Sequence, residues 1–223
     1  MKKKKNLIKI ISIMALLAVV IGIGATLAYF TDYDFASNII GAGHVDIILT
    51  EDMADPENPE GPVIPYVDPV NLEPGAVISK MPKITVAEDS LDSYVRAVVT
   101  VTNPEAAVPP VTIENIDIDE NWVIVADPKE SGTWYCYYIG GEDEGILKAG
   151  DSVYVFNQIE LPGAWELEMN DQKILVDVVA QAVQAEGFTP TYQRDAGGNI
   201  ISCAWLNADG EEVEAEVYAG TNK

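Results

Sequence analysis

The chain has 223 residues, which suits one domain with a short appendage, and it carries 36 acidic residues against 13 basic ones. Five of the bases lie within the first nine residues and the first acid is Asp32, so residues 29–223 hold 36 acids against eight bases. Such a negative surface repels nucleic acid and anionic lipid, which excludes a nucleic-acid-binding protein. Because 48% of the residues are hydrophobic, the chain still has enough apolar material for a folded core.

The N-terminus has the layout of an export signal. Residues 1–9 are basic, and residues 10–30 contain no charged side chain, which predicts a hydrophobic helix about long enough to span a bilayer. The small residues Thr26 and Ala28 predict that a signal peptidase cuts between Ala28 and Tyr29. The alternative is an uncleaved membrane anchor. Under both hypotheses the residues after the hydrophobic segment are exported, because the lysines keep the N-terminal end in the cytoplasm. We therefore expect a secreted or cell-surface protein.

Removal of the signal peptide, residues 1–28, would leave residues 29–43 as a linker in front of the domain. Apolar side chains alternate in it with Asp32, Asp34 and Asn38, which is the period of a strand. We predict that residues 29–40, once free, pair with an exposed sheet edge of another subunit. The assembly residues of this hypothesis are Tyr29, Phe30, Tyr33, Phe35 and Ile39. The alternatives are an edge strand folded back on its own domain and a disordered leader.

Residues 44–223 are expected to form one all-β domain, an antiparallel sandwich or barrel, because short alternating segments follow one another with turn signals between them. Residues 44–50 alternate in this way, and the proline-rich acidic stretch 51–74 predicts a long surface loop. Turn signals at 196–199 and 207–210 predict a C-terminal hairpin within residues 189–223. Further strands are expected over residues 76–86, 94–102, 111–118, 122–126, 134–139, 152–157 and 174–185.

In two of these expected strands the sequence pattern also predicts which face is buried. In residues 94–102 one face is entirely apolar, and the opposite face carries Arg96, Thr100 and Thr102. In residues 174–185 one face is also apolar, and the opposite face carries Asp177 and Gln181. The apolar positions are Val95, Ala97, Val99 and Val101 in the first strand, and Ile174, Val176, Val178, Ala180 and Ala182 in the second.

Cys136 and Cys203 both lie in strand-like segments of a chain expected to be exported. A bridge between them would close a loop of about 68 residues and, in the chain-entropy model, contribute roughly 4 kcal/mol. The alternative is two buried free thiols. Around Cys136, residues 134–138 place aromatic side chains on both faces of one strand. We expect one face to pack inward and the other to be covered, with carbohydrate stacking as the alternative.

The sequence offers little for catalysis. His44 is the single histidine, so an HExxH zinc site, which needs two, cannot be assembled. A serine triad or a Cys–His dyad would have to recruit His44, and the sequence has no G-x-S-x-G nucleophile elbow. Residues 117–121 begin like an EF-hand loop, but Trp122 and Pro128 stand where that loop needs Gly and Glu. We therefore expect no catalytic residue, cofactor site or specific metal site, and only weak, non-specific binding of divalent cations to the acidic surface. His44 is interpreted as an exposed strand residue.

The residues around the cleavage site carry a resemblance to a known family. GATLAYFTD, followed by GAGHVDIIL, is similar to the signal-proximal region of the TasA/camelysin family of exported Gram-positive proteins, which a dedicated SipW-type signal peptidase processes. The segments NLEPGAVISK, DSYVRAVVTVTN and VDVVAQAVQAEGF resemble later strands of that family in the same order. The resemblance covers about residues 1–190, and the acidic loop 51–74 and the tail from Thr189 depart from it.

The resemblance implies a secreted jelly-roll β-sandwich that, in the best understood members, assembles into extracellular fibres of the biofilm matrix. We therefore expect a fibre-forming surface or matrix subunit that assembles through donor-strand pairing of its processed N-terminus. Its partners would be further copies of itself and the signal peptidase, with the membrane touched only through residues 10–30 before cleavage. Camelysin-type relatives are classed as surface metallopeptidases, so a metallopeptidase is one alternative, against which the single histidine argues. A membrane-anchored binding module is the other.

Overall fold

The computed structural model describes residues 44–69, 73–105, 107–165, 173–198, 200–213, 215 and 217–220, which all belong to the compact unit His44–Lys223. The expected signal helix, the cleavage site at Ala28–Tyr29 and the assembly segment lie outside the described residues. No helix in the described part of the chain is long and apolar enough to cross a membrane. The described chain is all-β and its strands pair antiparallel, as the alternating sequence pattern predicts.

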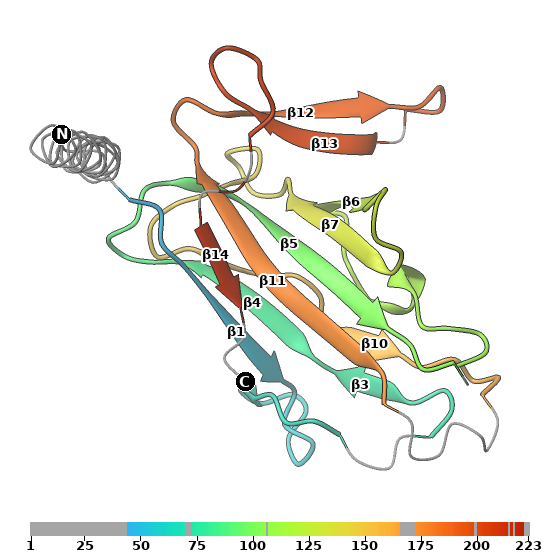
Figure 1. Ribbon diagram of the computed structural model, residues 1–223. Helices are drawn as coiled ribbons and strands as arrows, with labels where there is room; N and C mark the ends of the chain where they lie inside the picture. Colours follow the sequence, from blue (N-terminus) through green and yellow to red (C-terminus); the bar gives the residue numbers. More distant parts are fainter. Residues whose placement is uncertain are drawn as a thin grey trace, which may run out of the picture. The chain divides into compact units, whose positions relative to one another are not determined.

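Two antiparallel sheets form the body of this unit (Figure 1). The small sheet has the order β2-β1-β4-β9, with strands β1 (Ile47–Met53), β2 (Ile64–Pro65), β4 (Met81–Val86) and β9 (Ser152–Tyr154). The large sheet has the order β14-β11-β5-β7-β6, with strands β5 (Ser93–Thr102), β6 (Trp122–Ala126), β7 (Thr133–Tyr138), β11 (Leu175–Gln184) and β14 (Val217–Gly220). A short strand, β8 (Ile146–Leu147), also pairs with β5. Two further pairs are β3 (Val77–Ser79) with β10 (Gln158–Glu160), and β12 (Thr189–Arg194) with β13 (Ile200–Leu206).

The inner core lies between the two sheets and is built from the apolar faces that the sequence predicts. In β5 the residues from Val95 to Val101 alternate, with the odd-numbered side chains buried. β11 pairs with β5 over its whole length and directs Val178, Ala180 and Ala182 into the same core. From the small sheet, Ile47 and Ile84 are among those that meet them. The inward faces of β1, β5 and β11 are therefore confirmed.

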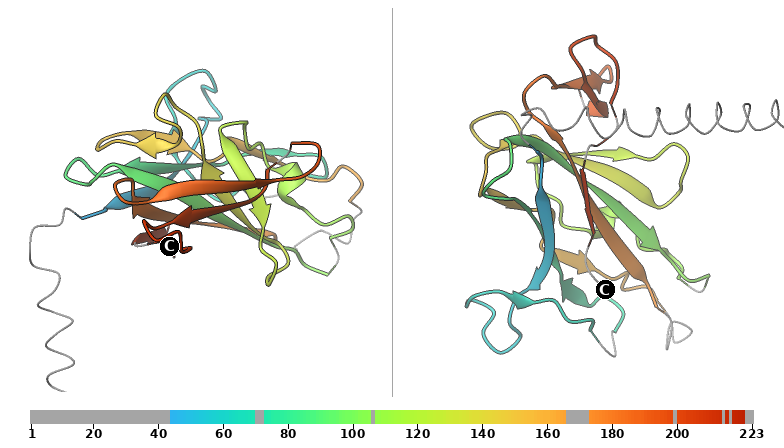
Figure 2. Two further views of the ribbon diagram at one scale, coloured as in Figure 1. Left: turned by 90° about the horizontal axis from the view of Figure 1, so that it is seen from above. Right: turned by 60° about the vertical axis from the view of Figure 1, so that its left-hand side comes forward.

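The C-terminal hairpin β12–β13 covers part of the opposite, outer face of the large sheet (Figure 2). Its turn follows Asp195, whose carboxylate accepts the Gly197 N–H at 2.8 Å, while Gly198 adopts a positive φ of 87° that suits glycine. The hairpin and the sheet enclose a second cluster, here called the outer cluster. Its buried members are Val123, Tyr137, Val183, Cys203, Trp205 and Ala215.

Three expected strands are not formed as predicted. The expected strand 152–157 ends at Tyr154, as β9. The expected strand 76–86 is divided into β3 and β4, which pair with different partners, and Lys80 stands at the break. The expected strand 111–118 is instead a short 3-10 turn, η1 (Ile113–Asn115), followed by a single bridge from Ile116 to Ile159. The Asn103 side chain holds the Val111 main chain through two hydrogen bonds of 2.8 Å, which satisfies these backbone groups without a neighbouring strand.

The acidic proline-rich stretch 51–74 is more ordered than a plain surface loop. β1 continues into its first residues, and β2 returns to pair with that end of β1. The Lys80 ammonium, almost fully buried, lies 2.6 Å from a Glu51 carboxylate oxygen and 4.0 Å from the centre of the Tyr66 ring. Burial of a cation is tolerated here because the charge has both a carboxylate and an aromatic face as partners.

Candidate cation site

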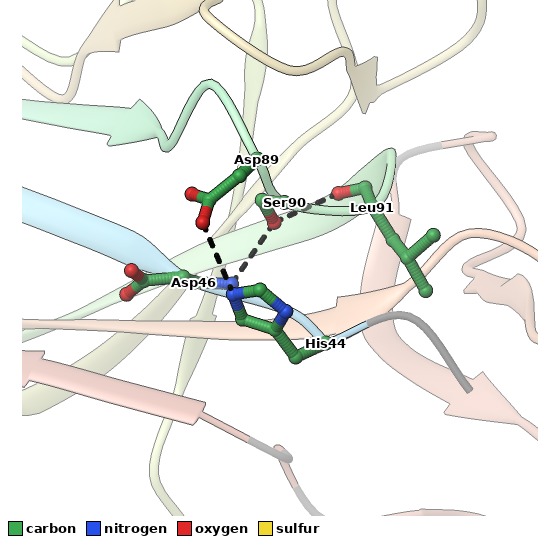
Figure 3. Close-up of polar contacts among 5 residues, drawn as sticks. All are labelled: His44, Asp46, Asp89, Ser90 and Leu91. Carbon is green, nitrogen blue, oxygen red and sulfur yellow. Dashed lines mark hydrogen bonds and ion pairs between the residues drawn. The ribbon is translucent and has the colours of Figure 1, made fainter. Parts of the chain in front are cut away.

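Three ligand-bearing side chains meet where the described chain begins (Figure 3). His44 and Asp46 are two residues apart at the entry to β1, so they share its exposed side, while Val45 and Ile47 turn toward the core. Asp89 comes from the turn between β4 and β5. All three side chains are exposed.

The two backbone segments that carry these side chains are fastened to each other. The Asp46 N–H donates to the Ser90 hydroxyl at 2.9 Å, and that hydroxyl donates to the Leu91 carbonyl at 3.0 Å. The Leu91 N–H in turn donates to the His44 carbonyl at 3.0 Å. These bonds fix the Cβ positions of the ligand-bearing residues, and only the side-chain torsions remain free.

The spacing of the ligand atoms is close to what a cation requires. One atom from each side chain lies within 4.8 Å of the other two, and His44 Nε2 is 3.8 Å from Asp89 Oδ2. The ligands of a tetrahedral zinc ion at about 2.1 Å would lie about 3.4 Å apart, so a small closing motion of exposed side chains would be enough. One imidazole and two carboxylates suit zinc or manganese, with water completing the coordination shell. When the imidazole is protonated, the same contact with Asp89 is an ion pair.

The interpretation of His44 is thus correct in one respect and incomplete in another. The side chain is exposed, as expected, but it precedes the first residue of β1 and lies beside Asp89, 45 residues further along the chain. The pair His44–Asp46 could have been recognised from their spacing, whereas nothing in the sequence indicates Asp89. In the EF-hand-like stretch, the Asp119 carboxylate accepts the Asn121 N–H at 2.8 Å, which closes a local turn. Among the described residues, the group at His44 is the one whose three ligand atoms come this close.

Both cysteines are free and buried in the structure, the arrangement of the second alternative, two buried free thiols. Cys136 belongs to the inner core and Cys203 to the outer cluster, so the large sheet lies between them and no bridge can form. Burial raises the pKa of each thiol to about 12, because a thiolate would lose its hydration in these apolar surroundings.

The outward aromatic face of β7 is covered by the hairpin and by a buried arginine. Arg96 lies on the outer face of β5, where it donates from Nε to Gln181 Oε1 and from Nη1 to Tyr137 Oη, both at 2.6 Å. Its guanidinium carbon lies 4.7 Å from the ring centre of Tyr135 and 4.8 Å from that of Trp205. The expectation that one face of this strand packs inward and the other is covered is therefore confirmed. The rings that would stack on a carbohydrate are occupied by Arg96 instead.

Comparison with known proteins adds no relative: no family model, no curated protein and no solved structure matches this chain. The function is therefore inferred from the residues and the fold.

Proposed function

We propose that this protein is a secreted structural subunit of the bacterial cell surface or biofilm matrix, with a jelly-roll β-sandwich domain, and that it forms fibres by strand exchange. The single observation that carries the proposal is the junction at His44. An all-β unit with antiparallel sheets begins there, directly after a segment whose side chains alternate as in a strand. Residues 29–40 would span about 40 Å when extended, which is long enough to reach a neighbouring subunit.

The energetics of the segment require a sheet edge as its partner. Tyr29, Tyr33, Phe35 and Ile39 share one face of the extended segment, and burial of each contributes about 2 kcal/mol. Fixing the backbone of a residue costs about 1–2 kcal/mol, so main-chain hydrogen bonds to a sheet edge are needed in addition. A soluble peptide without a sheet edge should therefore stay unordered, and a freed segment facing an edge should pair with it.

The charge of the subunit sets the conditions for assembly. With 36 acids against eight bases beyond residue 28, neighbouring copies repel each other. Salt, divalent cations and acidic pH weaken that repulsion, so each should promote fibres. Light scattering that stays unchanged across salt and pH would contradict this part of the proposal.

The direct test compares a chain that begins at Tyr29 with one that begins at Gly41. Both should give the same β-rich circular dichroism spectrum, because they share the whole described unit, but only the longer chain should form fibres in electron microscopy. Tyr33→Ser with Phe35→Ser, on the apolar face of the segment, should abolish fibres. The matched control, Asp34→Ser with Asn38→Ser on the polar face, should retain them. Equal polymerisation of the Tyr29 and Gly41 chains, or of neither, would overturn the donor-strand role.

A metallopeptidase is the second candidate, and the specific observation in its favour is the group His44, Asp46 and Asp89. Hollows of about 290 and 450 Å³ are lined by residues from 53–79 and 126–134, and neither includes a residue of this group. The test is casein hydrolysis by purified protein with zinc and with chelator, alongside His44→Ala. Chelator-sensitive hydrolysis that is lost in His44→Ala would favour the enzyme over the structural subunit.

A further inference from the structure

The two sheets leave a seam along one side of the described unit. The outermost long strand of the large sheet is β11, and β1 of the small sheet lies along the same side. The short C-terminal strand β14 lies in this seam, between β1 and β11 (Figures 1 and 2). Among the described strands, β14 pairs only with β11, through Val179–Ala182.

The strand register shows which part of the β11 edge is paired with described residues. β11 pairs with β5 along all ten of its residues, and with β14 along four. At the end of the β5–β11 ladder the Ala185 N–H donates to the Asp92 carbonyl, so odd-numbered residues of β11 direct their main-chain groups toward β5. Even-numbered residues therefore direct theirs into the seam. Val176 and Val178 lie beyond the end of β14, and none of the described residues pairs with their main chain on that side.

We propose that this seam is the acceptor for residues 29–40 of a second copy of the chain, and that β14 holds the same edge until the incoming strand displaces it. The proposal rests on the strand-exchange function above and names the surface that receives the strand. A strand in the seam has one face toward the inner core, beside Val178 and Ala180, and one face toward solvent. The assembly segment has a matching pattern, with Tyr29, Tyr33, Phe35 and Ile39 on one face and Asp32, Asp34 and Asn38 on the other.

The incoming strand has the advantage in length. β14 covers four residues of β11 and ends at a glycine, which contributes no side chain to a sheet. The assembly segment has twelve residues and could cover the whole edge, including the part at Val176 and Val178 that no described residue pairs on that side. β14 would thus keep the edge covered in the monomer without preventing exchange, which is how exposed edges are protected from uncontrolled pairing.

A reversible lock between β14 and β11 tests the proposal in the chain that begins at Tyr29. Val179 and Gly220 face each other as a non-hydrogen-bonded pair, in which Cα atoms are close enough for a disulfide, and Val179 is on the exposed side. The variant V179C/G220C should assemble when reduced, and when oxidised its lag time in light scattering should be at least tenfold longer. Cys136 and Cys203 should not interfere, because both are buried.

The matched control is L175C/T102C, which locks the other side of the same strand to β5 at an exposed pair. It should assemble equally in both redox states. Removal of residues 217–223 provides the opposite change and should shorten the lag. Equal assembly of V179C/G220C in both states would overturn the acceptor seam while leaving strand exchange intact. Failure of every variant to assemble in either state would overturn the fibre function and the seam with it.

Discussion

The inner core and the outer cluster are built from the two faces of the same large sheet, but in different ways. The inner core is formed by alternating small and branched apolar residues from both sheets, with Val99, Ala97 and Cys136 fully buried. The outer cluster surrounds Arg96, a charged side chain that is 8% exposed. A single strand, β5, supplies residues to both. Period-two alternation therefore identifies a face that packs on another sheet, but does not identify a polar face that a distant hairpin covers.

The outer cluster depends on geometry more than on apolar area. Arg96 connects three strands, because it lies on β5, donates to Gln181 on β11 and donates to Tyr137 on β7. Tyr137 and Trp205 meet edge to face, with ring centres 5.5 Å apart, which holds β13 against the sheet. We therefore expect changes in the inner core to affect the whole unit, and changes in the outer cluster to loosen the hairpin first.

The largest expected effect is in the inner core. Phe156→Ala removes a large side chain that is 1% exposed and should lower the free energy of unfolding by about 3–5 kcal/mol, measured by urea denaturation. The control Ile201→Ala, at a residue 57% exposed on β13, should change it by less than about 0.5 kcal/mol. A loss below about 1 kcal/mol in Phe156→Ala would show that the core relaxes around the cavity.

A smaller and more local effect is expected from Arg96→Met. The change leaves Tyr137 Oη and Gln181 Oε1 without their donor in a buried place, which should cost about 2 kcal/mol. Hydrogen exchange should increase in β12 and β13 before it increases in β4 and β5. The matched control is the second arginine of the chain, Arg194→Met, which is exposed and should change stability by less than about 0.5 kcal/mol. Uniform loss of protection throughout the unit would mean that the two regions unfold as one.

The pH dependence of stability provides a comparison of the two regions, because each region contains one buried thiol. The folded state raises each cysteine pKa from 9.0 to about 12 by burial, so the protonated thiol favours folding. This contribution is complete below pH 9 and is lost as pH rises toward 12, at about 1.4 kcal/mol per pH unit for each thiol. Cys136→Ala and Cys203→Ala should each reduce the slope of stability between pH 9 and 12 by that amount. An unchanged slope in Cys203→Ala would show that the outer cluster admits water.

The smallest expected effect is that of a reducing agent. Because Cys136 and Cys203 face opposite sides of the large sheet, reductant should change the free energy of unfolding by less than about 0.5 kcal/mol, whereas removal of a bridge over such a loop would cost about 4 kcal/mol. Titration of the unfolded, unreduced protein should find two thiols per chain. A chain without titratable thiols would mean that the cysteines pair in a different arrangement of the sheets.

Strands whose two faces differ in polarity are predictable from local sequence. β1, β5 and β11 each carry one apolar face with period two, and the glycine-rich turn after Asp195 marks the hairpin, because both signals are local and each depends on a few neighbouring residues. The same rule failed over residues 111–118. There the main chain of Val111 bonds to the Asn103 side chain, a partner that periodicity cannot indicate.

The neighbours of the chemically distinctive side chains are visible only in the folded arrangement of the strands. It brought Asp89 beside His44, placed Cys136 and Cys203 on opposite sides of a sheet, buried Arg96 under Trp205, and placed β14 along the edge of β11. In each case the partner is far away in the chain, and the contact depends on which strands become neighbours. A local pattern determines which way a side chain points from its strand, but the order of strands in the sheet determines what it meets there.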